Sequence, residues 1–130
     1  MYCFDTSIIV DIFHGDKDLI SKLSKIIESM EDIFITPITL CELYKGAYSF
    51  YNSEKEIKDL EEFTDNFELL NFEKEACKEF GKQYDKLKKI GKMTEESDLM
   101  IASIAKANGL VLVTRNKKHF ENIDIKIEVW

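Results

Sequence analysis

Two carboxylates of this chain stand at positions where an α/β protein can perform chemistry. Asp5 directly follows the apolar run 1–4, which has the pattern of a buried strand, so its carboxylate is held at the end of that strand. Asp98 shares one face of a predicted helix with three residues that follow it at helical spacing: Ile101, Ala102 and Ala105. Because that face must pack on the sheet through its alanines, Asp98 is drawn to the same edge, where open α/β sheets bind ligands. The pattern predicts a site for Mg²⁺, which prefers a few carboxylates and water.

Each acid also has a structural interpretation, which is favoured when the acid is considered alone. Asp5 is of a residue type common at helix N-caps, and Asp98 can complement the dipole at a helix start. Glu42 lies three residues after Thr39, which is the spacing of a capping box. Glu42 also lies off the apolar stripe of its predicted helix, so periodicity alone places it in solvent. From the residues themselves, the convergence of Asp5 with Asp98 favours a functional interpretation.

Short apolar runs that alternate with longer amphipathic stretches would position these acids. Strands are expected at 1–4, 33–35, 67–72, 110–113 and 123–129. Helices are expected directly after Asp5, through 19–30, from the start signal Thr36-Pro37 through 47, and over 53–66, 73–90 and 94–108. The alternation predicts an α/β fold: a three-layer α/β/α sandwich with a central, mainly parallel sheet. The unbroken runs 1–4 and 110–113 are expected in its centre and 123–129 at its edge, whereas the strand order stays open.

Composition favours one soluble domain over residues 1–130. Apolar residues make up 45% of the chain and charged residues 33%, and no repeat or linker divides it. The three cysteines, an odd number, lie in apolar contexts without ligand spacing, so we expect buried, reduced thiols at Cys3, Cys41 and Cys77. The sequence shows no signal-like or membrane-spanning run, which leads us to expect a cytoplasmic protein without membrane contact.

The net charge of −7 limits how this chain can bind nucleic acid. Broad, non-specific binding to phosphates depends on many Lys and Arg residues and is disfavoured. A nuclease is not excluded, because a metal ion held by carboxylates reverses the local sign of the charge. The acidity would equally suit a basic protein partner.

Four motifs resemble those of the PIN-domain family in their order and spacing. They are Asp5-Thr6-Ser7, Thr39-Leu40-Cys41-Glu42-Leu43 followed by Gly46, Asp98-Leu99-Met100-Ile101-Ala102 leading to Ala105, and Leu112-Val113-Thr114-Arg115-Asn116 with Phe120. No single motif is specific, but four in the same order are. The resemblance extends from Met1 to the end of the chain, and the length suits the VapC-type toxins of toxin–antitoxin systems.

This resemblance implies an endoribonuclease that hydrolyses RNA phosphodiester bonds with Mg²⁺ or Mn²⁺. Asp5, Glu42 and Asp98 would be its catalytic, metal-binding acids, and Glu42 rests on the resemblance alone. The residues that would hydrogen-bond a metal ligand or contact a phosphate are Thr6, Ser7, Thr114, Arg115 and Asn116. The resemblance further implies a VapB-type antitoxin as partner and a homodimer.

Asn116 departs from the family pattern, because many PIN domains carry a fourth acid at this position. An amide adds no charge, so the number of bound metal ions, one or two, stays open. Glu95 or Glu96, close before Asp98, is the auxiliary acid that could compensate. The departure also keeps a second function in view, a catalytically weakened PIN-fold module that binds RNA or protein.

Two histidines and a lysine pair complete the candidates. His14 and His119 are expected to be structural or solvated, because their positions do not suit a general-base pair. The pair Lys117-Lys118 would either touch RNA or form a solvated turn.

Overall fold

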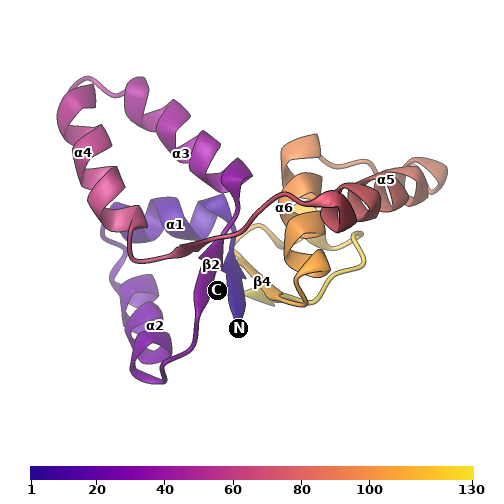
Figure 1. Cartoon of the computed structure of the whole chain (residues 1–130), viewed down its shortest axis with the longest axis horizontal. Helices are drawn as coiled ribbons and strands as arrows, with labels where there is room; N and C mark the ends of the chain where they lie inside the picture. The colour runs from indigo at the N-terminus through magenta and orange to yellow at the C-terminus, as the bar shows by residue number, and fades with distance from the viewer.

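A parallel sheet of five short strands lies at the centre of the computed structural model, which describes all residues from 1 to 130 (Figure 1). The strands run in the order β3-β2-β1-β4-β5. Their bounds are Tyr2–Phe4 for β1, Ile33–Ile35 for β2, Glu68–Leu69 for β3, Val111–Thr114 for β4 and Ile127–Val129 for β5. Every neighbouring pair is parallel, so each connection is a crossover that carries one or more helices.

Seven helices flank the sheet and complete three layers, which confirms the predicted α/β/α fold. Their bounds are Thr6–Phe13 for α1, Lys17–Glu28 for α2, Pro37–Tyr48 for α3, Ser53–Thr64 for α4, Lys74–Lys89 for α5, Glu96–Ala107 for α6 and Lys117–Phe120 for α7. In Figure 1, α1 to α4 stand on one side of the sheet and α5 and α6 on the other. No helix combines the length and the apolar character needed to cross a membrane.

The alternating side chains of the strands build two separate cores. Phe4 of β1 and Val113 of β4 pack with α1 to α4, whereas their neighbours Cys3 and Leu112 pack with α5 and α6. This alternation is what a strand buried on both faces requires. Both β1 and β4 are therefore central, as their unbroken apolar runs predicted, and β5 is an edge strand.

The start of α3 confirms one sequence signal and corrects another. Thr36 is the N-cap, its Oγ1 accepts a hydrogen bond of 3.1 Å from the Thr39 backbone N–H, and Pro37 is the first helical residue. Thr39 therefore lies inside the helix rather than at its cap. The capping-box interpretation of Glu42 is wrong, because the residue three positions before it is not an N-cap.

Other predictions differ from the structure in extent. The expected strand 67–72 pairs only over Glu68–Leu69, and the expected strand 123–129 only over Ile127–Val129. The segment expected to be a solvated turn at Lys117-Lys118 is the one-turn helix α7. Of the three cysteines only Cys3 is buried, while Cys41 and Cys77 are exposed, because their helices turn those positions away from the cores.

The strand order decides where a ligand can bind. The chain leaves β1 towards β2 on one side and later returns to β4 on the other, so the order reverses between β1 and β4. Crevices at the carboxyl ends of such strands are the usual ligand sites of open α/β sheets. Asp5, just after β1, donates its backbone N–H to the Val113 carbonyl of β4 over 2.9 Å. The switch point therefore lies at Asp5.

Candidate active site

Asp5 is buried at the end of β1 and is held by three hydrogen bonds. Its Oδ1 accepts from the Thr6 backbone N–H over 2.7 Å, which makes Asp5 the N-cap of α1. Its Oδ2 accepts from Ser7 Oγ over 3.0 Å and from Thr114 Oγ1 over 2.8 Å. The carboxylate is 3% exposed, so these donors compensate for the water it has lost. The structural and the functional interpretations of Asp5 are therefore compatible, because the same contacts that cap α1 also fix its orientation.

Thr114, the last residue of β4, connects this strand to Asp5 through its side chain. Its hydroxyl donates to Asp5 and accepts from the Asn116 backbone N–H over 2.9 Å, and the residue is fully buried. The Asn116 side chain makes no capping hydrogen bond at the start of α7. Asn116 thus reaches the site through its backbone, and its amide contributes neither charge nor a contact to Asp5.

Glu42 comes to the site from α3 and is half-buried. Its Oε1 accepts a hydrogen bond of 2.8 Å from Thr6 Oγ1, and the Thr6 hydroxyl also lies 3.1 Å from Thr39 Oγ1. The Thr6 side chain therefore joins α1 to α3. Periodicity along α3 wrongly placed Glu42 in solvent, because the apolar stripe reports packing on the sheet and not the contact of the helix start with α1.

Asp98 lies in the first turn of α6 and is 8% exposed. Burial and, next in size, the nearby Asp5 carboxylate raise its pKa to about 6. The His119 imidazole acts in the opposite direction, whereas Glu95 and Glu42 add smaller repulsions. The predicted convergence is present in the structure, since the Asp5 carboxylate lies close enough to Asp98 to disfavour its charge.

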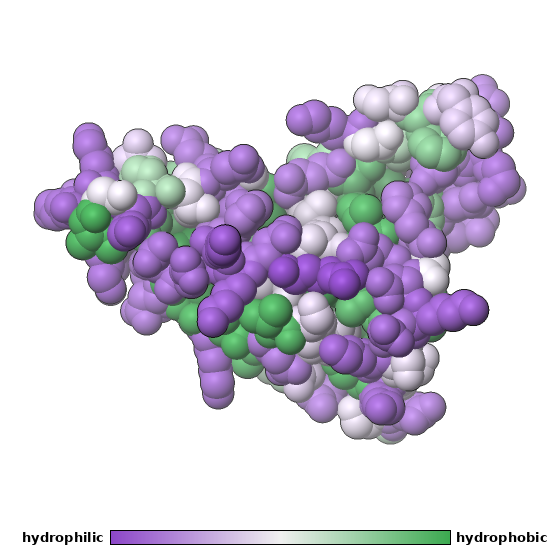
Figure 2. Space-filling model, turned by 180° about the vertical axis from the view of Figure 1, so that it is seen from behind, coloured by the Kyte–Doolittle hydropathy of each residue, from purple (hydrophilic) through white to green (hydrophobic).

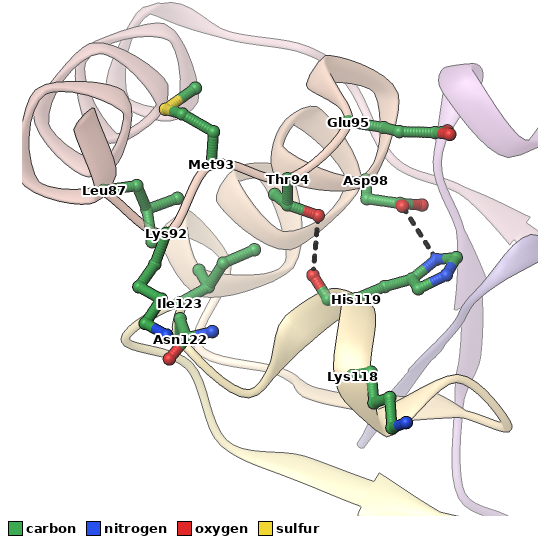
Figure 3. A pocket seen from close by; sticks show the side chains of 10 residues that line it. All are labelled: Leu87, Lys92, Met93, Thr94, Glu95, Asp98, Lys118, His119, Asn122 and Ile123. Carbon is green, nitrogen blue, oxygen red and sulfur yellow. Dashed lines mark hydrogen bonds and ion pairs between the residues drawn. The ribbon is translucent and has the colours of Figure 1, made fainter. Parts of the chain in front are cut away.

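His119 of α7 is the site residue that the sequence did not indicate. Its Nδ1 lies 3.0 Å from Asp98 Oδ2, as the dashed line in Figure 3 marks. The side chain is half exposed, which agrees with the solvated interpretation, but α7 also turns the imidazole towards α6. This contact is an ion pair when the imidazole is protonated, but no donor meets Asp98 Oδ2 in hydrogen-bond geometry. Asp98 Oδ2 is thus a buried oxygen without a hydrogen bond.

The two auxiliary candidates differ in position. Glu95 is the N-cap residue of α6 and extends in Figure 3 in the same direction as Asp98, with which it lines a cavity. Glu96 is exposed and does not line that cavity. Glu95 is therefore the better placed of the two.

Arg115 lies across the loop after β4 and is engaged by acids. Its Nη1 lies 2.9 Å from Asp11 Oδ2 and 3.0 Å from Asp16 Oδ2. The pairs tie this loop to the end of α1 and the start of α2. The two ion pairs engage the Arg115 guanidinium, which the sequence indicated as a phosphate contact. That phosphate contact stays a prediction.

The acids fit a divalent cation. No three acidic, histidine or cysteine side chains are already grouped as a complete set of metal ligands. Mg²⁺ usually takes one or two carboxylates and keeps several waters, so it does not need such a set. Asp98 Oδ2, buried without a hydrogen bond and opposed by neighbouring carboxylates, is the oxygen that a cation would satisfy.

The fold and its acids define a class of α/β proteins whose carboxylates gather at the carboxyl edge of the central strands, where open α/β sheets bind ligands. The family model of the PIN domain matches residues 2–126. The chain belongs to the PIN-domain family, which confirms the resemblance drawn from its four motifs.

Similar proteins place it near the VapC members of that family. The chain is 30% identical to Ribonuclease VapC2 of Haemophilus influenzae over 130 residues, which cover 99% of this chain and 97% of that protein. It is 36% identical over 97 residues to the tRNA(fMet)-specific endonuclease VapC of Salmonella typhimurium, covering 74% of each. Its fold matches a crystal structure of VapBC2 from Rickettsia felis bound to a promoter DNA fragment, with a TM-score of 0.93, 27% identity and coverage of 99% and 98%. The names of these relatives support a nuclease of the VapC type.

Proposed function

We propose that this chain is a metal-dependent endoribonuclease and the toxin of a VapBC-type toxin–antitoxin pair. One observation carries the catalytic part of the proposal. Asp98 holds a buried oxygen without a hydrogen bond beside the oriented carboxylate of Asp5, at the strand ends where this fold class binds ligands. Similarity to VapC ribonucleases along nearly the whole chain supports RNA as the substrate.

Asp5 and Asp98 would hold Mg²⁺ or Mn²⁺, with Glu42 as a further ligand directly or through water. When bound, the cation supplies a water of lowered pKa and neutralises charge that develops on the phosphate. Ser7 and Thr114 keep Asp5 Oδ2 in one orientation, and Thr6 does the same for Glu42. These hydroxyls therefore prepare the acids before the substrate arrives.

The charges at the site favour one tightly held ion. Asn116 adds no negative charge, and its amide makes no contact with Asp5 or Asp98. Glu95 lies near Asp98 and is the remaining acid on which a second ion could depend. We therefore propose one metal ion between Asp5 and Asp98.

A VapB-type antitoxin and a second copy of the chain are the proposed partners, in the cytoplasm. The turn between α3 and α4 exposes the large side chains Tyr48, Phe50 and Tyr51, of which Tyr51 is 93% exposed. Figure 2 shows green and pale side chains at the end of the projecting lobe that α3 and α4 form. Exposed aromatic side chains of this kind are typical of protein contacts.

The test is cleavage of a panel of defined single-stranded RNAs by protein freed of any antitoxin, with Mg²⁺, with Mn²⁺ and with EDTA. Asp5→Asn and Asp98→Asn should each lower kcat/KM by about a thousandfold or more, the equivalent of ~4 kcal/mol of lost transition-state stabilisation. Asp18→Asn removes an exposed acid of α2 with the same change in charge and should cleave like the wild type. A folded wild type that neither binds Mn²⁺ nor cleaves would leave the RNA- or protein-binding module as the better account.

A further inference from the structure

A cavity of about 420 Å³ opens beside Asp98 and is not lined by Asp5 or its hydroxyl donors. Its walls come from the loop between α5 and α6, the first turn of α6, and α7 with the residues that follow it (Figure 3). The Thr94 hydroxyl of the first wall donates to the His119 carbonyl of the last over 2.9 Å, which holds the walls together. A cavity of this size can enclose a ligand as large as one nucleotide.

The cavity has acids on one side and lysines at two separate places on its rim. Figure 3 shows Glu95 and Asp98 together on one side, with Lys92 and Asn122 across the cavity and Lys118 below His119. The ion pairs and side-chain hydrogen bonds of the chain engage neither lysine, nor the Asn122 amide. Three side chains with uncommitted donors thus line a cavity in a protein whose net charge is −7.

The remaining wall is apolar. Leu87 is fully buried beneath the cavity, Ile123 is nearly so, and the thioether of Met93 is 46% exposed at its rim. A methionine sulfur makes favourable contacts with aromatic rings. A flat, partly apolar nucleobase can pack on Met93, whereas an inorganic ion would leave this side chain without a contact.

From this arrangement we propose that the cavity binds one nucleotide of the RNA strand, the neighbour of the nucleotide whose phosphate lies at Asp5 and Asp98. The phosphate of the bound nucleotide accepts from Lys92 and Asn122, because the Glu95 and Asp98 carboxylates across the cavity repel it, and Lys118 attracts the strand from the side of α7. The base of the nucleotide packs on Met93, the exposed apolar side chain of this wall. The proposal rests on the proposed ribonuclease function, and it names the subsite that holds the substrate next to the reacting bond.

The test compares two double variants with the same loss of charge. Lys92→Gln with Lys118→Gln removes both lysines of the cavity, and Lys88→Gln with Lys126→Gln removes two exposed lysines that do not line it. The cavity variant should raise KM for a single-stranded RNA heptamer about tenfold at nearly constant kcat. It should also lower the slope of log kcat/KM against log salt by about 0.7, the value for one phosphate contact on a single strand. The control variant should change KM less than twofold.

Binding of the fluorescein-labelled heptamer, followed by fluorescence anisotropy, separates failure of this proposal from failure of the proposed function. If the wild type cleaves and both variants have its KM, the subsite is refuted and the nuclease stands. If the wild type cleaves nothing but binds the heptamer, loss of binding in the cavity variant alone still supports the subsite. The proposal would be overturned if the wild type does not bind RNA. It would also be overturned if the cavity variant loses binding to a polyglutamate peptide but keeps its binding to RNA.

Discussion

The two acids that meet at the candidate active site have opposite surroundings. Asp5 accepts three hydrogen bonds from its own helix and from β4, and these donors stabilise its charge in the folded protein. Asp98 is equally buried, but its Oδ2 has no hydrogen bond, and burial with the Asp5 carboxylate raises its pKa to about 6. One carboxylate thus stabilises the fold, whereas the other costs stability. Functional sites typically hold an acid whose charge destabilises the folded protein.

The largest effect on stability that this comparison predicts is at Asp5. Asp5→Ala removes the cap of α1 and leaves the buried Thr114 hydroxyl without its acceptor. The free energy of unfolding should fall by about 2–4 kcal/mol, as the sum of a lost cap and an unpaired buried donor. Urea denaturation in EDTA measures this loss.

Asp16→Ala is the control for that measurement, because Asp16 is likewise the N-cap of its helix, α2, but lies nearer the surface and has only an exposed pair with Arg115 besides its capping bond. Its loss of stability should be clearly smaller than that of Asp5→Ala. Equal losses at the two caps would mean that the hydrogen bonds of Ser7 and Thr114 contribute little.

At Asp98 the expected effect on stability has the opposite sign. A folded-state pKa of about 6, above the ordinary value of 3.8, means that the folded chain binds this proton more tightly than the unfolded chain. The contribution is present below pH ~4 and is lost as the pH rises through 6. In EDTA at pH 8, Asp98→Asn should therefore raise the free energy of unfolding by about 1–2 kcal/mol. This figure already allows for the favourable interaction with the α6 dipole that the variant loses with its charge.

The same pair of proteins at pH 4 supplies the control, because both side chains are then uncharged and the difference should nearly vanish. A variant that is less stable than the wild type at pH 8 would contradict the picture of Asp98 as a disfavoured charge. Together with loss of cleavage, greater stability in Asp98→Asn would identify an acid kept for function.

The smallest effect is expected at Arg115, whose ion pairs with Asp11 and Asp16 are exposed. Arg115→Gln should lower Tm slightly at low salt and not at 0.5 M NaCl, because salt screens exposed pairs. KM for RNA should rise less than threefold, since the guanidinium is already engaged by two carboxylates. A rise of tenfold or more would show instead that Arg115 leaves these acids to contact a phosphate.

The sequence predicted most of the elements, because their signals are local. An apolar run that ends at Asp5, a Thr36-Pro37 helix start and the small face of α6 each depend on a few neighbouring residues. They were enough for the three-layer fold and for the convergence of Asp5 with Asp98. The extent of β3 and β5 was less predictable, because strand pairing depends on the partner strand as well as on the strand itself.

What the sequence by itself determined is the class of the fold, the central place of β1 and β4, and two carboxylates at one edge of the sheet. Only the tertiary structure decided that Thr6 holds Glu42, that α7 turns His119 to Asp98, and that a cavity opens between Lys92 and Lys118. The physical reason is that periodicity reports which face of one element is buried. Contacts between elements depend on how helices cross and how loops close, and those angles are set by the packing of the whole chain.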